Sequence, residues 1–230
     1  MKKLVLFDID GTLLDSGGAG RRAMITAFEQ VFGTAGPVDR YSMAGKVDSQ
    51  IVVELMRAAG LPDETIHAQM PAYFEAYVSE LQRIIDHHPV RSLPGVTELL
   101  DRLTQHPNVV VGLLTGNIWR GAQEKLKAAN LASYFDGLGA FGEDALSRPE
   151  LPAIAVRRAE EAVREKFRGK DVVIVGDTPA DIDCGRALGV KSIAVATGPY
   201  SCEELREHQP DFCFPNLSDT EAIIRAISDD

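Results

Sequence analysis

The chain has 230 residues, of which 45% are hydrophobic and 25% charged, a composition typical of a globular protein with an apolar core. Its 34 acidic residues outnumber 24 basic ones, and the net charge of -10 argues against nucleic acid and anionic membranes as partners. Since no apolar run approaches the ~20 residues of a membrane span and Cys184, Cys202 and Cys213 lack metal-type spacing, we expect a cytoplasmic protein with reduced thiols.

The first half of the chain changes character after one strand. Residues 4–9 are predicted to form a buried strand because their start is continuously apolar, and the glycine-rich segment 16–20 then breaks the pattern. From there to about residue 90 no strand pattern occurs. Apolar residues instead recur at helical spacing in three stretches, at 24–31, 51–59 and 74–85. Pro71 precedes the third stretch, where we expect the first turn of a helix.

The second half alternates strands with helices. Helices are predicted at 96–103, 118–129, 152–167, 179–188 and 220–227, and strands at 109–114, 138–141, 172–175, 190–196 and 212–214. Near-continuous apolar strands between helices indicate an α/β fold with a parallel sheet covered on both faces. We assign residues 1–15 and 91–230 to this core and residues 16–90 to an inserted all-helical cap domain, with glycines and prolines at the two crossings.

Two acidic residues follow the first strand. Asp8 and Asp10 lie two positions apart on an extended chain, so their side chains point the same way. Carboxylates this close disfavour joint ionisation, and a metal ion or a shared proton must compensate. Gly11 allows a tight turn that brings backbone N–H groups to the same spot. These groups suit Mg2+-assisted phosphoryl transfer, although Asp, Gly and Thr after a strand also form ordinary turns.

Polar residues also follow the strand at 109–114. In parallel sheets, ligands bind beyond the carboxyl ends of the strands, so these residues are expected beside Asp8. The Thr115 hydroxyl and the N–H groups of Gly116 and Asn117 are candidate contacts for phosphate oxygens. The alternative is that Thr115 or Asn117 simply caps the next helix.

The strand at 172–175 ends in another pair of acidic residues. Asp177 is a candidate Mg2+ ligand together with Asp8, because hard cations require clustered oxygen ligands. Asp181 could join the site through water. Its alternative is purely structural, since Thr178 as N-cap, Pro179 at the first helical position and an acid at N3 make a good helix start.

Two basic residues are candidates for anion binding. Arg148 lies in a loop before a predicted helix, and Pro149 keeps it extended, so its guanidinium could hold two phosphate oxygens or remain an exposed charge. Lys46 lies in the predicted cap, in the segment 44–48 before a helix. It could contact an anionic substrate, or it could be a solvated lysine at a helix start.

These segments, in this order, resemble the haloacid dehalogenase-like (HAD) superfamily of hydrolases, above all phosphoglycolate phosphatase-type members with a small helical cap. The resemblance rests on DIDGT at residues 8–12 and GDTPAD at residues 176–181. It implies a Rossmann-like core, Mg2+ and an aspartyl-phosphate intermediate. It also implies the following roles: Asp8 as nucleophile, Asp10 as general acid/base, Thr115 as phosphate-binding hydroxyl, Asp177 as metal ligand and Asp181 as its support.

The chain departs from the family in its third motif. Members usually carry a lysine followed by Pro-x-Pro, whereas this chain has Arg148 and one residue more before the second proline. Arginine keeps the positive charge but is larger and planar.

We therefore expect a Mg2+-dependent phosphatase that hydrolyses a small phosphorylated metabolite, as a monomer or homodimer. The expected catalytic residues are Asp8, Asp10, Thr115 and Arg148, the metal ligands Asp8, Asp10, Asp177 and Asp181, and the substrate-binding residues Gly116, Asn117 and Lys46. Three alternatives stay open: a phosphonoacetaldehyde hydrolase with a Schiff base on Lys46, a sugar-phosphate mutase on the same core, and a non-catalytic sensor of a phosphorylated metabolite.

Overall fold

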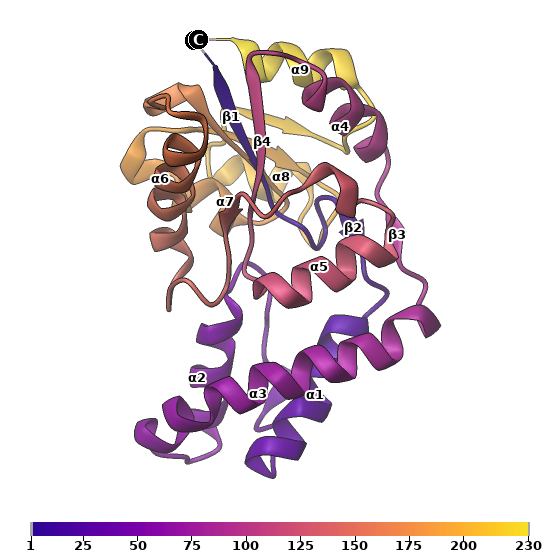
Figure 1. Ribbon diagram of the computed structural model, residues 1–230, viewed down its shortest axis with the longest axis vertical. Helices are drawn as coiled ribbons and strands as arrows, with labels where there is room; N and C mark the ends of the chain where they lie inside the picture. The colour runs from indigo at the N-terminus through magenta and orange to yellow at the C-terminus, as the bar shows by residue number, and fades with distance from the viewer. Residues whose placement is uncertain (1, 230) are drawn as a thin grey trace.

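A parallel six-stranded sheet forms the centre of one half of the molecule in the computed structural model, which describes residues 2–229 (Figure 1). The strands follow the order β5-β4-β1-β6-β7-β8. Their bounds are β1 Lys3–Phe7, β4 Val109–Leu114, β5 Gly139–Ala140, β6 Val172–Gly176, β7 Lys191–Val195 and β8 Phe212–Phe214. Every neighbouring pair is parallel, and β1 lies between β4 and β6, with Leu4 opposite Val110 and Val172.

Helices cover both faces of this sheet, as the continuous apolar strands predict. They are α4 Val96–Thr104, α5 Trp119–Ala128, α6 Leu151–Val163, α7 Pro179–Cys184, α8 Cys202–Glu207 and α9 Thr220–Ser228. Short 3-10 helices lie at Val38–Arg40, Ile85–His87, Ala132–Tyr134, Arg148–Glu150, Gly169–Asp171 and Arg186–Leu188. The α/β fold class is thereby confirmed.

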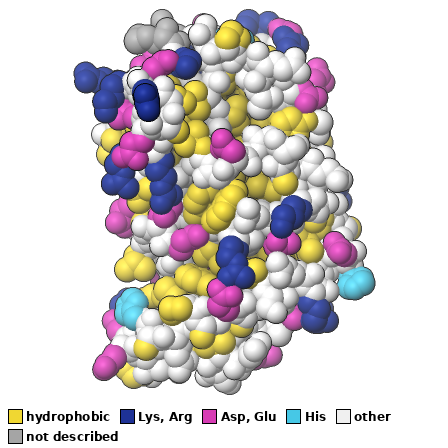
Figure 2. All heavy atoms as spheres, viewed as in Figure 1, with side chains coloured by type: hydrophobic (Ala, Val, Ile, Leu, Met, Phe, Trp, Pro, Cys, Tyr) yellow, Lys and Arg dark blue, Asp and Glu magenta, His cyan; other side chains and the backbone are white. Residues whose placement is uncertain are grey.

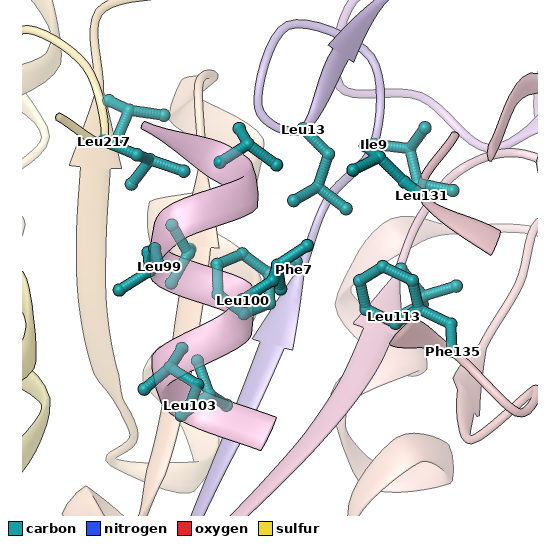
Figure 3. Packing of buried hydrophobic residues seen from close by; sticks show 14 of the residues in the cluster. Phe7, Ile9, Leu13, Leu99, Leu100, Leu103, Leu113, Leu131, Phe135 and Leu217 are labelled. Carbon is teal, nitrogen blue, oxygen red and sulfur yellow. The ribbon is translucent and has the colours of Figure 1, made fainter. Parts of the chain in front are cut away.

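Alternate residues of β1 supply the two halves of the core. Val5 and Phe7 belong to a buried cluster with residues of α4, α5 and α9, and Figure 3 shows Phe7 beside Leu99 and Leu100 of α4. Leu4 and Leu6 face the other side, in a cluster with residues of α6. Because apolar side chains are buried on both faces of β1, this strand is held at the centre of the core. Its carboxyl end is therefore in a fixed position.

Three helices form a second layer at the carboxyl ends of the strands, seen at the bottom of Figure 1. They are α1 Ala19–Phe32, α2 Asp48–Ala58 and α3 Asp63–Ile84. They share a separate apolar cluster in which the rings of Phe28 and Tyr73 lie 4.4 Å apart. Where the chain leaves and re-enters the core, β2 (Leu14–Asp15) and β3 (Arg91–Ser92) pair antiparallel and hold the two crossings together.

The structure corrects several predicted boundaries. Pro71 does not begin a helix but lies inside α3, which starts eight residues earlier, where Pro62 precedes the acidic residues Asp63 and Glu64 of the first turn. The predicted helix at 152–167 ends at Val163, before a residue in the left-handed conformation. The predicted helix at 179–188 ends as α7 at Cys184, because the chain tightens into a 3-10 turn after it. The short pair β2–β3 was not predicted, since two-residue strands carry no periodic signal.

The surface shows no separation of charge on the face drawn in Figure 2, where basic and acidic side chains lie next to one another. Ion pairs near the surface of the protein include Arg57–Asp63 and Lys166–Glu160. Among the described residues, no helix is long and apolar enough to cross a bilayer.

Candidate active site

A cavity of about 340 Å³ lies between the carboxyl ends of the core strands and the helical layer. Asp8, Asp10 and Asp177 contribute to its core side, and Met24, Tyr77 and further residues of 16–90 to the opposite side. Ligands of open parallel sheets bind at this edge, so the cavity is the candidate site.

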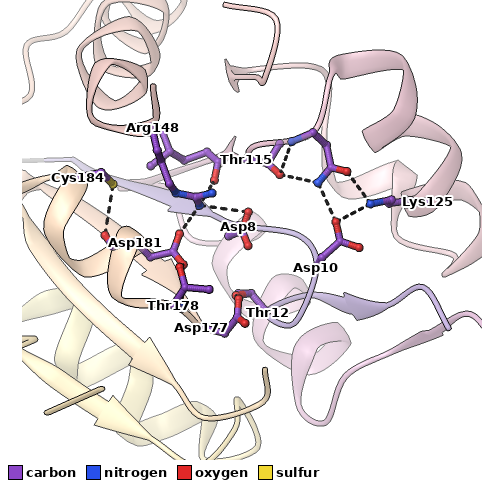
Figure 4. A network of polar contacts seen from close by, with 12 residues as sticks. Asp8, Asp10, Thr12, Thr115, Lys125, Arg148, Asp177, Thr178, Asp181 and Cys184 are labelled. Atoms are coloured by element: carbon purple, nitrogen blue, oxygen red, sulfur yellow. Dashed lines mark hydrogen bonds and ion pairs between the residues drawn. The ribbon is translucent and has the colours of Figure 1, made fainter. Parts of the chain in front are cut away.

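Three buried carboxyl groups meet at this edge of the sheet, one after β1 and two at the start of α7 (Figure 4). One oxygen each from Asp8, Asp177 and Asp181 lies within 4.8 Å of the others. Asp8 directly follows β1, and its N–H donates a hydrogen bond to Val175 O of β6 at 2.9 Å, so the register of the two strands sets its place. Asp177 follows β6, and Asp181 lies in the first turn of α7.

The electrostatics of this cluster favour a cation. Burial raises the pKa of Asp8 to about 6, although the nearby charge of Arg148 opposes the shift. Burial, then the charges of Asp8 and Asp181, raise the pKa of Asp177 to about 9. Without a cation, the three carboxyl groups repel one another when all are ionised. Mg2+ prefers oxygen ligands, and its charge would offset this repulsion, so the three groups are a suitable ligand set for it. The residues present therefore fit the expected ion.

Two glycines hold Asp177 in place by leaving no room beside it. A Cβ on Gly11, whose φ is +83°, would lie 2.4 Å from Asp177 Oδ2, and one on Gly198 would lie 1.7 Å from the same atom. The hydroxyl of Thr12 donates to Asp177 Oδ1 at 3.1 Å. The position of this carboxylate is thus determined by backbone on two sides.

Arg148 is buried, not an exposed loop charge, with 4% of its surface accessible. Its Nη2 lies 3.3 Å from Asp8 Oδ1, forms an ion pair with Asp181 Oδ1 and donates to Leu114 O at 3.3 Å. Its Nε–H is buried and has no partner among the described residues. The arginine therefore spans two acidic groups of the cluster.

The position of Asp181 is compatible with both of the functions considered for it. Its Oδ2 accepts hydrogen bonds from the N–H and the hydroxyl of Thr178, at 2.9 and 2.6 Å, which completes the predicted helix start. Its Oδ1 faces Arg148 and the other two carboxylates. Capping therefore orients the acid toward the cluster instead of competing with that position.

Asp10 was expected beside Asp8 as a further metal ligand, but its side chain is not among the three clustered carboxylates, because β1 ends at Phe7 and the chain turns after it. Its Oδ2 accepts hydrogen bonds from Lys125 Nζ at 2.6 Å and Asn117 Nδ2 at 2.8 Å (Figure 4). Burial would raise its pKa, but the charge and hydrogen bond of Lys125 and the hydrogen bond from Asn117 outweigh burial and lower it. Asn117 also donates to Thr115 Oγ1 at 2.9 Å, so the two predicted phosphate-loop side chains are joined to Asp10.

Lys46 lines the cavity, but its ammonium group is already paired. Lys46 Nζ donates to Glu54 Oε2 at 2.6 Å and to Tyr41 Oη at 3.0 Å, and it lies 4.2 Å from the centre of the Tyr41 ring. The backbone around it fits tightly against Gly116, where a Cβ would lie 2.0 Å from Lys46 O.

Two further polar residues lie at the site: Lys125, which the sequence did not single out, and Asp48, which was named only as part of the cap segment 44–48. Both are buried. Lys125 lies on the buried face of α5 with Ala122 and Leu126. A lysine at a position where the helical spacing predicts an apolar residue could have indicated a buried, paired charge. Asp48 accepts a hydrogen bond from Ile118 N–H at 2.8 Å, and its own N–H donates to Gly116 O at 2.7 Å, so it joins α2 to the loop that follows β4. Burial raises its pKa to about 7.

Comparison with known proteins agrees with this geometry. The profile of the haloacid dehalogenase-like hydrolase family matches residues 5–195. The chain belongs to the haloacid dehalogenase-like hydrolases. It is therefore an enzyme of the hydrolase class, as the motifs at residues 8–12 and 176–181 predict.

Several relatives in this family are similar over nearly their whole length. The chain is 26% identical over 235 residues to the probable phosphatase IndB of Dickeya dadantii, and this alignment covers 99% of this chain and 95% of that protein. It is 28% identical over 221 residues to a phosphoglycolate phosphatase of Synechococcus elongatus, covering 94% and 93%. A hydrolase of Pseudomonas syringae has a similar crystal structure, with a TM-score of 0.73, 20% identity and 98% of each chain covered. This last likeness supports the fold.

Proposed function

We propose that the protein is a Mg2+-dependent phosphatase that hydrolyses a small phosphomonoester through an aspartyl-phosphate at Asp8. The observation that carries the proposal is the convergence of Asp8, Asp177 and Asp181 within 4.8 Å at the carboxyl end of the sheet, with a buried arginine beside them. The phosphatase names of several relatives support the same reaction class. The proposal includes a cytoplasmic location and a monomer or homodimer.

In this scheme Asp8, Asp177 and Asp181 hold Mg2+, which when bound keeps Asp8 ionised and neutralises charge on the phosphoryl group. The carboxylate of Asp8 attacks phosphorus in line with the leaving oxygen. Donors for the phosphoryl oxygens are the Arg148 guanidinium, the Thr115 hydroxyl and the N–H groups of Gly116 and Asn117. Each such preorganised donor contributes about 3–4 kcal/mol of transition-state stabilisation.

Asp10 exchanges the proton in both steps. In its protonated form it donates to the leaving oxygen, and in its ionised form it removes a proton from the water that cleaves the aspartyl-phosphate. Lys125 and Asn117 favour the ionised form in the free protein. A bound phosphate ester would bring negative charge beside Asp10 and so raise its affinity for the proton that the first step needs.

Residues 16–90 act as the cap that selects the leaving group. The cavity of about 340 Å³ accommodates a small metabolite, the substrate class of a phosphoglycolate phosphatase-like enzyme. The apolar side chains of Met24, Met43 and Ile51 and the charged side chains of Arg21 and Lys46 line this part. Because Lys46 Nζ is held by Glu54, it is a poor nucleophile for a Schiff base, and we favour the phosphatase over the phosphonoacetaldehyde hydrolase.

The test is hydrolysis of p-nitrophenyl phosphate with and without Mg2+. We expect turnover that requires the ion, is abolished in Asp8→Asn and is retained in Asp183→Asn, whose carboxyl group is exposed on α7. Equal activity of Asp8→Asn and the wild-type protein would refute the scheme. A wild-type protein that binds phosphate esters without releasing phosphate would instead support the sensor.

A further inference from the structure

Lys125 is an unusually placed lysine. Only 5% of its surface is accessible, whereas lysine side chains are almost never fully buried unless they are paired. A buried ammonium must find hydrogen-bond acceptors, and Lys125 Nζ donates to Asp10 Oδ2 and to Asn117 Oδ1, both at 2.6 Å. The lysine comes from the core helix α5, yet both of its acceptors belong to the candidate active site.

The lysine fixes the orientation of the Asn117 amide. An ammonium has three donors and no acceptor, so the atom of Asn117 that faces it must be the carbonyl oxygen. The amide nitrogen is then directed to Asp10 Oδ2, at 2.8 Å, and to Thr115 Oγ1, at 2.9 Å. Since Thr115 Oγ1 accepts this hydrogen bond, its own O–H remains available to donate to a phosphoryl oxygen.

The lysine also fixes the Asp10 carboxyl group. Lys125 and Asn117 both donate to Oδ2, and two donors on one oxygen prevent free rotation of the group. This arrangement keeps the Asp10 side chain out of the cluster formed by Asp8, Asp177 and Asp181. An acid that joined the cluster as a further ligand would not be free to exchange a proton with the substrate.

The helical layer leaves space for the lysine at the start of α1, where Gly20 is the second helical residue. A Cβ at Gly20 would lie 3.0 Å from both Cε and Nζ of Lys125. The Tyr77 ring packs against Gly121, one turn before Lys125 on α5. The Tyr77 hydroxyl, which would lie 3.9 Å from a Cβ at Gly20, has no hydrogen-bond partner within residues 2–229. Both sides of the cavity are therefore shaped around this ammonium group.

We propose that Lys125 is a positioning residue for proton transfer by Asp10: it orients Asp10 directly, and Thr115 through Asn117. The inference rests on the proposed phosphatase function and adds to it a residue outside the recognised motifs. The alternative is a buried ion pair that only stabilises the fold. The positioning role and the purely structural role predict different effects of a Lys125 variant on the reaction rate when the leaving group of the substrate changes.

The test compares phenyl phosphate with p-nitrophenyl phosphate in Lys125→Met. The two esters have similar size, but phenolate is much the more basic leaving group and depends more on a donated proton. We expect kcat/KM for phenyl phosphate to fall about 100-fold, within the usual range for general acid catalysis, and that for p-nitrophenyl phosphate to fall by a much smaller factor. Lys125→Arg should restore part of the loss, and Lys127→Met, an exposed lysine on the same helix, should change neither ester.

A second arm measures the coupling to Asp10. In an Asp10→Asn background, Lys125→Met should cost less than about threefold, because the group it positions no longer transfers a proton. This double variant pairs two neutral side chains, so it is informative even where Lys125→Met folds poorly. Equal losses on both esters, or the same loss with and without Asp10, would overturn the inference. If the wild-type protein hydrolyses neither ester with Mg2+, the proposed function fails first and the role of Lys125 with it.

Discussion

Replacing Arg148 by methionine should destabilise the protein far more than the loss of an ordinary ion pair. The Arg148 side chain is 5% exposed, and its partners Asp8 and Asp181 are 9% and 2% exposed. Methionine fills a similar space but leaves two buried carboxylates without their cation. Breaking a buried pair from one side typically costs about 3–5 kcal/mol, and we expect this loss for Arg148→Met without metal.

The matched control is Arg158→Met. Arg158 pairs with Asp144, but its side chain is 37% exposed, so solvent screens the interaction and the expected loss is below about 1 kcal/mol. Urea unfolding of both variants measures the difference. Saturating Mg2+ should stabilise the wild-type protein and both variants, because the ion binds only the folded chain. It should narrow the stability difference from the wild-type protein in Arg148→Met but not in Arg158→Met, since only in the first does the ion replace a missing charge. Equal losses in the two variants, or no effect of Mg2+ on the first, would refute the assigned position of Arg148 between the acids.

Two further predictions concern the surroundings of the cluster. Gly198→Ala forces a Cβ to 1.7 Å from Asp177 Oδ2, so the carboxylate must move and Mg2+ affinity should fall about 10–100-fold in a titration of activity, whereas an unchanged affinity would argue against Asp177 as a ligand. Asp48→Asn tests a pH effect. The pKa of Asp48 rises from 3.8 to about 7 on folding, so the wild-type protein loses stability as pH rises through this interval, by up to about 4 kcal/mol. The free energy of unfolding of the variant, measured in urea, should therefore rise relative to that of the wild-type protein between pH 5 and pH 8. A difference in this free energy that stays constant with pH would contradict the burial argument.

Local patterns were sufficient to predict most of the fold. The continuous apolar strands and the helical block before residue 90 correspond to the sheet and to the second layer. Two acids separated by one residue after β1, and one acid at the end of β6, were expected to meet because parallel strands end at one edge. Asp8 and Asp177 do lie together there.

The remaining features depend on packing between distant elements. No pattern in the sequence shows that Lys125 reaches Asp10, 115 positions away, or that Arg148 is buried between two acids. Lys46 is a case in which tertiary structure occupies a group that the sequence suggested was free. Its ammonium group donates to Glu54, which lies further along α2, and so is already paired. Side-chain partners of charged residues are set by tertiary structure, which a single sequence does not encode in its periodicity.

Binding of Mg2+ to the substrate-free protein, followed by titration calorimetry, tests the grouping of the three carboxylates most directly. We predict one ion per chain in the wild-type protein and in Asp183→Asn, and affinity weakened by 10-fold or more in Asp8→Asn and Asp177→Asn. Wild-type protein that binds no divalent cation, or an Asp177→Asn variant that binds it as tightly as the wild-type protein, would contradict the account.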